Sequence, residues 1–231
     1  MQSSIPMKII ATLHGAFPTK FGIPRQSGLV EDLEATVVFE PEYRNPDALR
    51  GLEGFSHLWL IWSFSQAIRP HWSPTVRPPR LGGNARLGVF ATRSPFRPNP
   101  IGLSCVRLLG VEEQPGLGPV LRVAGADLVD GTPIFDIKPY LPYSDIRPEA
   151  TAGFAPGADT VLEVVFPPGL LERVPPEKRA ALTGVLSCDP RPAYQKDPDR
   201  VYGLDFAGLN VRFSVCGQLL TVLDVRPLPA H

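Results

Sequence analysis

The sequence predicts a mainly β protein, in which an antiparallel β-barrel core domain at residues 1–150 precedes a small α+β domain at residues 151–231. Three observations lead to this fold class. Proline occurs 28 times and is spread along the chain, which favours short strands joined by stiff loops over long helices. Short apolar runs recur between these prolines. A length of 231 residues allows one large β domain or one domain with a smaller appended unit.

Seven strands are expected in the first domain, each an apolar run bounded by turn-forming residues. A short helix follows the second strand, because Asn45 is a good N-cap and Pro46 suits the first helical position before Arg50. The segment Val129-Asp130-Gly131-Thr132 indicates a hairpin turn between two of the strands. Together the strands predict a closed or nearly closed antiparallel sheet. They cover residues 8–13, 34–39, 57–64, 87–91, 102–111, 120–125 and 133–138.

The chain changes character after Pro148, where a loop rich in Ala, Gly and Pro begins. A strand is expected at residues 160–166, and Pro175-Pro176-Glu177 begins a helix that ends near Ser187. Two or three terminal strands follow, at residues 201–206, 210–215 and 219–225, with a turn at residues 216–218 between the last two. This order of elements predicts the small α+β unit.

A proline-rich loop carries two arginines between apolar runs, in the segment GVFATRSPFRPNPIG at residues 88–102. Its prolines exclude a helix between Ser94 and Pro100. Arg93 and Arg97 therefore lie four residues apart on a stiff, extended loop, where guanidinium groups suit a carboxylate or a phosphate. The alternative interpretation is a stiffened turn whose arginines are merely solvated.

The charge around this loop is strongly asymmetric. The whole chain is neutral, with 23 basic and 23 acidic residues, yet no Asp or Glu occurs between Glu53 and Glu112. Such a region attracts anionic ligands and nucleic acid even when the total charge is balanced. It contains no lysine and seven arginines, namely Arg69, Arg77, Arg80, Arg86, Arg93, Arg97 and Arg107.

Aromatic residues are interleaved with the arginines and could stack on bases. Trp59, Trp62 and Phe64 lie in an apolar run and are expected to pack in the core of a buried strand. Trp72 follows a histidine and precedes Ser73-Pro74, so it is expected to be more exposed and is the better stacking candidate.

Several classes of protein are excluded by what the sequence lacks. No apolar run approaches the roughly 20 residues that a membrane span requires, and the N-terminus has no signal-peptide pattern, so we expect a soluble, cytoplasmic protein. Cys105, Cys188 and Cys216 are odd in number and widely spaced, and the histidines have no ligand spacing. Neither a disulfide framework nor a metal site is indicated. The glycine-rich fingerprints of nucleotide-binding proteins are also missing.

Six segments, in this order, closely resemble the TsaA/TrmO family, and the match covers nearly the whole chain. The last segment resembles the C-terminal extension of bacterial members. The segments are Pro24-Arg25-Gln26, RGLEGFSHLW at 50–59, PPRLGGNAR at 78–86, the loop at 88–102, DLVDGTP at 127–133 with DIKPY at 136–140, and DPRPAY at 189–194.

The resemblance implies a tRNA N6-methyltransferase whose cofactor is S-adenosyl-L-methionine. Its substrate would be the N6-threonylcarbamoyladenosine next to the anticodon of threonine tRNA. The family fold is a β-barrel that binds the cofactor without a Rossmann sheet, usually as a homodimer with the site close to the subunit interface. This would explain why the glycine fingerprint is missing.

By the same resemblance, several positions are expected to contact the cofactor. An arginine such as Arg25 or Arg93 would clamp its carboxylate, and Asp127 or Asp130 would accept from its amine or ribose hydroxyls. Ser65 departs from the histidine that relatives often have, so a stacking surface is lost there. The positions are Pro24, Arg25, Gln26, Ser65, Gln66, Arg93, Leu103, Asp127, Leu128, Val129, Asp130 and Gly131.

The ureido nitrogen of the substrate is a weak nucleophile, so a base is expected near it. Asp136, Lys138 and Tyr140 alternate along one run and would share one face of a strand, which makes them the catalytic candidates. The alternative is a structural ion pair beside a rim tyrosine. Asp130-Gly131 likewise has the alternative of a simple turn.

Contacts with tRNA are expected at arginines of the acid-free region and in the DPRPAY segment. The alternative for Asp189 and Arg191 is that they only cap the preceding helix and fix the turn. The expected positions are Arg86, Arg97, Asp189, Arg191 and Tyr194.

A second class of function stays open from the sequence, namely a β-barrel that binds RNA without catalysis. Its arginines would grip phosphates and its aromatic residues would stack on bases. Stabilisation by S-adenosylmethionine would distinguish the two, because only the enzyme has a reason to bind that cofactor.

Overall fold

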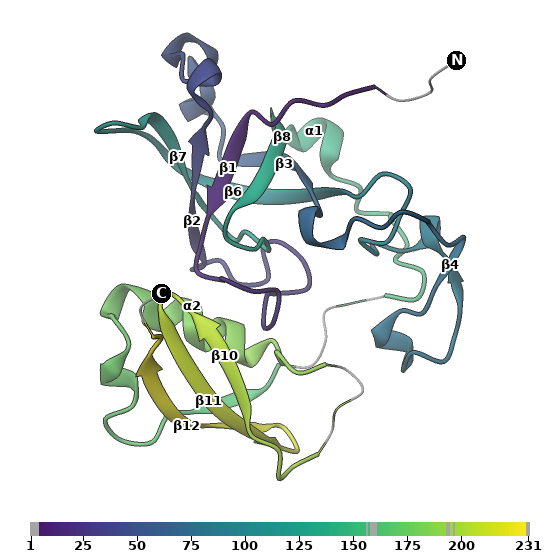
Figure 1. Cartoon of the computed structure of the whole chain (residues 1–231), viewed down its shortest axis with the longest axis vertical. Coiled ribbons are helices and arrows are strands. Elements are labelled where there is room, and N and C mark those ends of the chain that lie inside the picture. Colours follow the sequence, from purple (N-terminus) through teal and green to yellow (C-terminus); the bar gives the residue numbers. More distant parts are fainter. Residues whose placement is uncertain (1–4, 156, 158–160, 193–194, 196, 230–231) are drawn as a thin grey trace.

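The computed structural model describes residues 5–155, 157, 161–192, 195 and 197–229. Two β units are joined by the segment after Ile146 (Figure 1). The first, purple to teal, is built from the N-terminal strands, and the second, green to yellow, contains the C-terminal strands and the longest helix.

Six antiparallel strands form a closed barrel in the order β1-β2-β7-β6-β3-β8. Closure comes from β8, which pairs back with β1 so that Ala11 lies opposite Ile134. The mainly β fold class is confirmed. The barrel strands are β1 Ala11–His14, β2 Glu34–Phe39, β3 His57–Ser63, β6 Ile101–Gln114, β7 Gly118–Ala124 and β8 Thr132–Pro139.

Alternation along β3 separates the barrel core from its outer face. Leu58, Leu60 and Trp62 point inward and are buried. Gly102 on β6 is required beside Trp62, because a Cβ atom there would lie 2.2 Å from the indole ring. The expectation that Trp59 is a core residue is wrong. It lies on the other face and donates from Nε1 to the Asp145 carboxylate at 3.0 Å.

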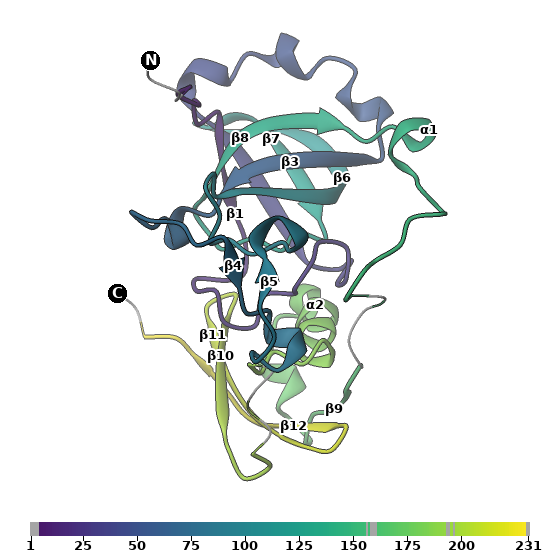
Figure 2. The ribbon, with the colours of Figure 1, turned by 90° about the vertical axis from the view of Figure 1, so that its right-hand side faces the viewer.

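The strand expected at residues 87–91 is shorter than predicted and lies outside the barrel. Only Leu87–Gly88 (β5) is extended, and it pairs with Thr75–Val76 (β4) in a separate two-stranded ribbon. The chain then turns through a 3₁₀ turn, Val89–Ala91, because the N–H of Thr92 returns to the carbonyl of Val89. Figure 2 shows the ribbon between the barrel above and the C-terminal unit below.

The hairpin expected at residues 129–132 is also wrong. A turn is present, since the N–H of Thr132 donates to the carbonyl of Val129 at 3.2 Å and Gly131 adopts a φ of 75°. However, β7 pairs with β2 and β6, whereas β8 pairs with β1 and β3. The turn therefore joins strands that are not neighbours.

The short helix expected after Asn45 is a 3₁₀ helix, Pro46–Leu49, in which the Asn45 side chain accepts from the N–H of Asp47 at 3.0 Å. After β8, the short helix α1 (Pro142–Asp145) leads toward the linker.

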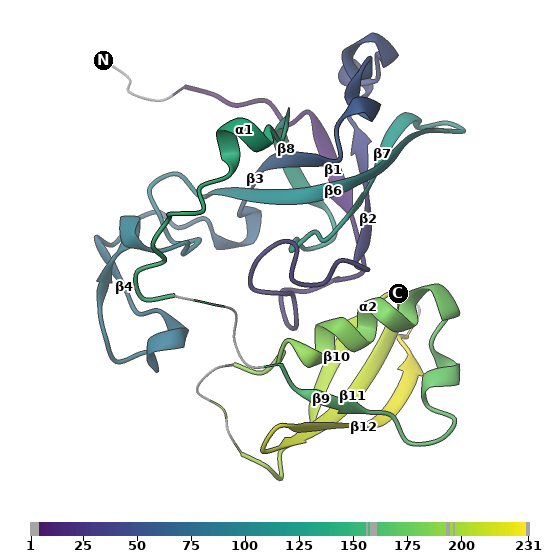
Figure 3. The ribbon, with the colours of Figure 1, turned by 180° about the vertical axis from the view of Figure 1, so that it is seen from behind.

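The C-terminal unit is a four-stranded sheet covered on one side by a helix. Its order is β10-β11-β12-β9, with β9 parallel to β12 and the other pairs antiparallel. The helix α2 lies on the side of the sheet nearer the barrel (Figure 3). The elements are β9 Glu163–Val165, α2 Pro176–Ser187, β10 Tyr202–Phe206, β11 Leu209–Cys216 and β12 Leu219–Pro227.

The loop between β1 and β2, residues 15–33, belongs to both units. Figure 3 shows it in purple, extending from the barrel toward α2. Phe17, Val30 and Leu33 are buried in the core of the C-terminal unit rather than in that of the barrel. The ring of Phe17 meets the ring of Phe206 edge-on at 5.5 Å. The C-terminal core is therefore completed by an N-terminal loop.

Candidate functional site

A cleft of about 1460 Å³ opens beside the start of β6. The β4–β5 ribbon, the proline-rich loop and the 15–33 loop contribute to its walls, and Phe154 of the linker also lines it. No Asp or Glu is present among its described lining residues, and its strong positive field would favour an anionic ligand. Six arginines line it, namely Arg25, Arg69, Arg77, Arg86, Arg93 and Arg97.

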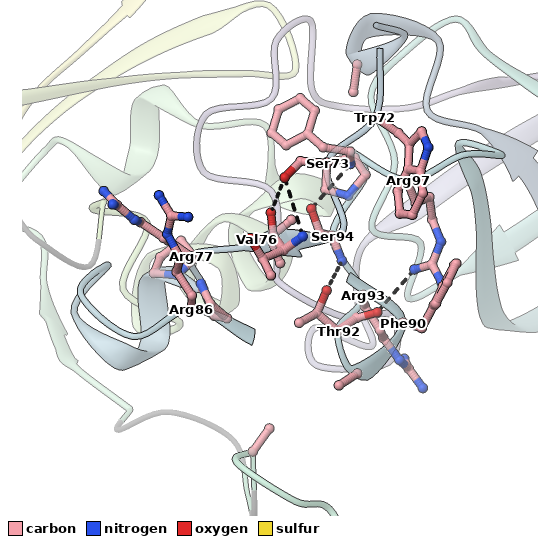
Figure 4. A pocket seen from close by; sticks show the side chains of 18 of the residues that line it. Trp72, Ser73, Val76, Arg77, Arg86, Phe90, Thr92, Arg93, Ser94 and Arg97 are labelled. Atoms are coloured by element: carbon pink, nitrogen blue, oxygen red, sulfur yellow. Dashed lines mark hydrogen bonds between the residues drawn. The ribbon is translucent and has the colours of Figure 1, made fainter. Parts of the chain in front are cut away.

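The proline-rich loop is held by side-chain hydroxyls rather than by regular structure. Thr92 Oγ1 donates to the carbonyl of Val89 at 2.9 Å and accepts from the N–H of Ser94 at 3.2 Å. Ser94 Oγ in turn accepts from the N–H of Phe96 at 3.2 Å. Arg97 closes the loop by donating from Nη1 to the carbonyl of Thr92 at 3.1 Å, as drawn in Figure 4. These bonds fix the backbone that presents Arg93.

Arg93 reaches across the cleft wall to the 15–33 loop, where its Nη1 donates to the side-chain oxygen of Gln26. Behind this pair, Asp127 accepts from Ser104 Oγ at 2.5 Å, and that hydroxyl accepts from Trp62 Nε1 at 2.9 Å. Burial raises the pKa of Asp127, while the hydrogen bond from Ser104 and the charge of Arg93 oppose the rise. The Asp127 carboxylate thus lies within reach of the charge of Arg93, although it is not among the residues that line the cleft.

The structure brings several of the expected cofactor contacts to this corner. Arg25, Gln26 and Arg93 line the cleft, and Pro24, directly before Arg25, is buried. Leu103 lies on the adjoining outer face of β6 with 54% of its surface exposed. Ser65 and Gln66 are exposed residues of the 3₁₀ turn Ser65–Ala67. They do not line the cleft, but the next residue, Ala67, does.

The remaining expected contacts lie elsewhere in the single chain. Leu128 is buried in the barrel core, and Val129 and Gly131 form the turn before β8. The Asp130 carboxylate accepts from the N–H of Gly15 at 3.1 Å. None of the four lines the cleft.

Asp136, Lys138 and Tyr140 share the outer side of the barrel. Lys138 Nζ lies 2.9 Å from the Asp136 carboxylate, and the ring of Tyr140 packs 5.8 Å from the ring of Trp59. These contacts match the alternative of an ion pair beside a packed tyrosine. None of the three lines the cleft.

Asp189 and Arg191 hold each other in a two-point ion pair after α2. Arg191 donates from Nε at 2.8 Å and from Nη2 at 2.9 Å, with 11% of its side chain exposed. Asp189 adopts a φ of 52°, which the pair helps to hold. Burial opposes ionisation of Asp189, but the hydrogen bonds from Arg191 bring its pKa below the ordinary value, and nearby Arg25 adds to this. Tyr194 lies outside the described residues.

The cleft also contains Arg77 and Phe90, which the sequence did not single out as site residues. Arg77 and Arg86 extend the β4–β5 ribbon by one position on each strand, and their guanidinium groups lie together in Figure 4. Phe90, expected within a strand, is 73% exposed beside Trp72, whose exposure was expected. The absence of acid in this region was the available signal for Arg77. For Phe90 the signal was its place among the aromatic residues interleaved with the arginines, but the strand expected at residues 87–91 did not predict its exposure.

Two further findings concern only the described residues. No cluster of three or more His, Cys, Asp or Glu side chains there is arranged to hold a metal ion. No helix in the same ranges has the length and apolar character needed to cross a membrane.

Comparison with known proteins gives matches along the whole chain. Residues 12–146 match the model of the tRNA-methyltransferase O N-terminal domain, and residues 160–228 match the TrmO C-terminal domain. The tRNA (adenine(37)-N6)-methyltransferase of Escherichia coli is 42% identical over 234 residues, which cover 97% of this chain and 99% of that protein.

Two further matches come from Pseudomonas aeruginosa. A putative S-adenosylmethionine-dependent methyltransferase, RcsF, is 40% identical across 94% of this chain and 95% of its own length. The crystal structure of TrmO superposes with a TM-score of 0.79 at 34% identity, covering 96% of this chain and 99% of that one. The shared fold therefore extends over both β units.

Proposed function

The chain belongs to the tRNA-methyltransferase O family and is an S-adenosylmethionine-dependent tRNA (adenine(37)-N6)-methyltransferase, and we propose that the base it methylates is N6-threonylcarbamoyladenosine in threonine tRNA. The observation that carries the substrate is the cleft, whose described lining contains six arginines and no acidic residue. The threonyl group adds a carboxylate to the adenine, and guanidinium groups pair well with carboxylates. This function is favoured over a non-catalytic RNA-binding barrel.

We assign the cofactor to the corner where Arg93, Gln26 and Asp127 meet. S-adenosylmethionine carries a carboxylate, an ammonium group and ribose hydroxyls, and this corner offers a guanidinium, an amide and a carboxylate. Arg93, or Arg25 beside it, would hold the cofactor carboxylate. Asp127 would accept from the amine or a hydroxyl, and the hydrogen bond from Ser104 would keep its other oxygen oriented. The chemical groups present therefore fit the cofactor.

The cofactor supplies a methyl group on a positively charged sulfur, which the N6 nitrogen attacks in line. The contribution of the protein is then mainly to hold the nitrogen about 3 Å from that methyl group. The lone pair of the ureido nitrogen is delocalised, so its proton must leave during or before the attack. Asp136, Lys138 and Tyr140 are proposed as the catalytic residues, and Asp136 would take the proton once its ion pair with Lys138 opens.

The arginines away from this corner are proposed to hold tRNA. Arg97 and Arg86 line the cleft, and Arg86 has Arg77 beside it. Two neighbouring guanidinium groups suit one phosphate. Asp189 and Arg191, fixed to each other after α2, would contact the same RNA. Tyr194 is proposed as a further contact.

We further propose a cytoplasmic homodimer with residues 1–150 as the cofactor domain and residues 151–231 as a tRNA-contacting domain. Exposed apolar side chains on one strand support the dimer, since Ile101, Leu103 and Leu109 of β6 are 37%, 54% and 39% exposed. A partner subunit there could also bring residues 128–131 toward a cleft. Leu103→Glu is expected to give monomers in sedimentation analysis.

The substrate is tested with threonine tRNA that does or does not carry threonylcarbamoyladenosine. Incubation with S-adenosylmethionine followed by nucleoside mass spectrometry should show one added methyl group on the modified nucleoside only. Equal methylation of unmodified adenosine would contradict the proposed substrate but leave the family activity intact.

The proposed roles of the two loop arginines, Arg93 for the cofactor and Arg97 for tRNA, are tested by replacing each of them. Arg93→Ala is expected to weaken cofactor binding about tenfold or more, because it removes a charge-assisted hydrogen bond of roughly 1.5–3 kcal/mol. Arg97→Ala is expected mainly to weaken tRNA binding and to reduce its salt dependence. Titration calorimetry with cofactor and filter binding with tRNA measure the two effects, with Arg226→Ala on β12 as the control. Equal losses of cofactor affinity in both loop variants would contradict these roles.

A further inference from the structure

Two large aromatic side chains stack on each other at the mouth of the cleft. Trp72 and Phe90 are 53% and 73% exposed, and their ring centroids lie 6.2 Å apart with an angle of 30° between the planes. Such exposure of adjoining large apolar groups is unfavourable unless a partner covers them. The rings already contact each other, so a third ring would stack on the pair rather than between its members.

The exposure of this pair is imposed by the fold around it. The N–H of Val89 donates to the carbonyl of Pro74 at 2.9 Å, which joins the two segments that carry the rings. The Val89 side chain is buried at 1% exposure, so the 3₁₀ turn directs the next residue, Phe90, outward. On the other segment, Ser73 Oγ donates to the carbonyl of Thr75 at 2.8 Å and fixes the turn after Trp72.

The surroundings of the pair identify the chemistry of its partner. Arg69 lies over the ring of Phe96 at 3.5 Å, and Arg97 is at the same side of the cleft as Trp72 in Figure 4. Acidic side chains are absent from the described lining of the cleft. Exposed aromatic rings among arginines without acid are the combination that binds unpaired bases and their phosphates. A protein partner would also be expected to meet acidic groups, which the described lining lacks.

We propose that Trp72 and Phe90 form a stacking platform for an unpaired anticodon-loop base that flanks the target adenosine. The inference rests on the proposed function and adds a second contact to it. The cofactor corner holds the reacting base, and the platform holds a neighbouring base so that the loop is opened and kept in register. Such stacking tolerates different bases, because every base has a π face.

The test measures steady-state methylation of modified tRNA by Trp72→Ala, Phe90→Ala and Trp72→Phe. Each alanine variant should raise KM for tRNA about 5- to 150-fold, because stacking is worth about 1–3 kcal/mol per base. The affinity for S-adenosylmethionine should not change, and Trp72→Phe should keep most of the tRNA affinity. Tyr143→Ala is the control, since Tyr143 is 86% exposed on α1, outside the cleft lining.

A binding experiment separates this proposal from the function on which it rests. Anticodon stem-loops with one abasic nucleotide at each flanking position are titrated by fluorescence anisotropy. The intact protein should lose affinity at one position, and the Trp72→Ala variant should show no further loss there. Equal losses in both proteins, or unchanged KM in the alanine variants, would overturn the platform. Absence of methylation by the intact protein would overturn the proposed substrate, while the anisotropy result would still decide the platform.

Discussion

The two β units differ in how their cores are completed. The buried core of the barrel comes from the barrel strands and the loops that immediately follow them, such as Leu49 and Leu128. The core of the C-terminal unit instead takes Phe17, Val30 and Leu33 from the loop between β1 and β2. That loop also carries Arg25 and Gln26 to the cleft.

The difference shows how the C-terminal unit can serve a site that it does not itself contain. The Arg93–Gln26 contact depends on the position of the 15–33 loop, and that position depends on packing against α2 and β10. Two close approaches fix it, since a Cβ atom on Gly184 would lie 2.8 Å from Val30, and one on Gly22 would lie 2.3 Å from Leu204. A destabilising substitution in the C-terminal core should therefore weaken cofactor binding, whereas a comparable substitution in the barrel core far from the cleft should not.

The largest expected effect is that of Phe17→Ala. Its side chain is 1% exposed against Phe206, so its removal should lower the free energy of unfolding by about 3–5 kcal/mol. The variant should also bind S-adenosylmethionine more weakly under conditions where it is fully folded. Urea denaturation and titration calorimetry measure the two effects.

Leu121→Ala is the matched control in the barrel. Leu121 is 0% exposed on β7, and its truncation should cost about 2–5 kcal/mol with little change in cofactor affinity. If both variants were destabilised alike and neither changed the affinity for the cofactor, the 15–33 loop would only complete the C-terminal core. The difference between the two cores would then have no effect on the site.

A smaller effect is expected from Gly22→Ala, because this glycine combines a left-handed backbone with a close neighbour. Its φ is 83°, and the added Cβ atom would lie 2.3 Å from Leu204 Cδ1. Gly208→Ala is the control, since its φ is 79° but no atom lies within 4 Å of the added carbon. Thermal unfolding should place the Gly22 variant about 1–3 kcal/mol below the control, which is the cost of overpacking. Equal stabilities would mean that the loop yields freely at this contact.

The barrel could be predicted from the sequence because its signals are local. Apolar runs at 34–39, 57–63 and 120–125 define strands whichever partners they find. The 15–33 loop could not be assigned to the second core in this way. Phe17 and Val30 are apolar residues among prolines and glycines, and their partners lie more than 100 residues away. The hairpin expected at Asp130-Gly131 was wrong for the same reason, since a turn sequence does not specify which strands pair.

The candidate site was predictable only in part. The acid-free run of arginines indicated the cationic cleft, and proline spacing indicated its stiff loop. The link from Arg93 to Gln26 joins residues 67 positions apart, and no local pattern encodes it. The dual use of Trp62, as a core residue and as donor to Ser104 behind Asp127, is likewise a consequence of barrel closure.

The smallest expected effect tests whether the loop after α2 supports the 15–33 loop or only itself. Arg191→Lys keeps the charge but loses the two-point fork to Asp189, which should cost about 1–2 kcal/mol. Arg226→Lys is the control. The side chain of Arg226 is 72% exposed and forms an ion pair with Asp224, so this change should alter the free energy of unfolding by no more than roughly 0.5 kcal/mol.

The pKa of Asp189 is lowered in the folded protein, so the stabilisation that its carboxylate contributes is present above the ordinary carboxyl pKa and is lost as the pH falls through the lowered value. Urea denaturation at a series of pH values should therefore show a smaller acid-side loss in Arg191→Lys than in the unaltered protein. If Arg191→Lys also lowered the affinity for the cofactor, the ion pair would help to position Arg25 in the 15–33 loop. If the affinity did not change, the ion pair would stabilise only the turn after α2.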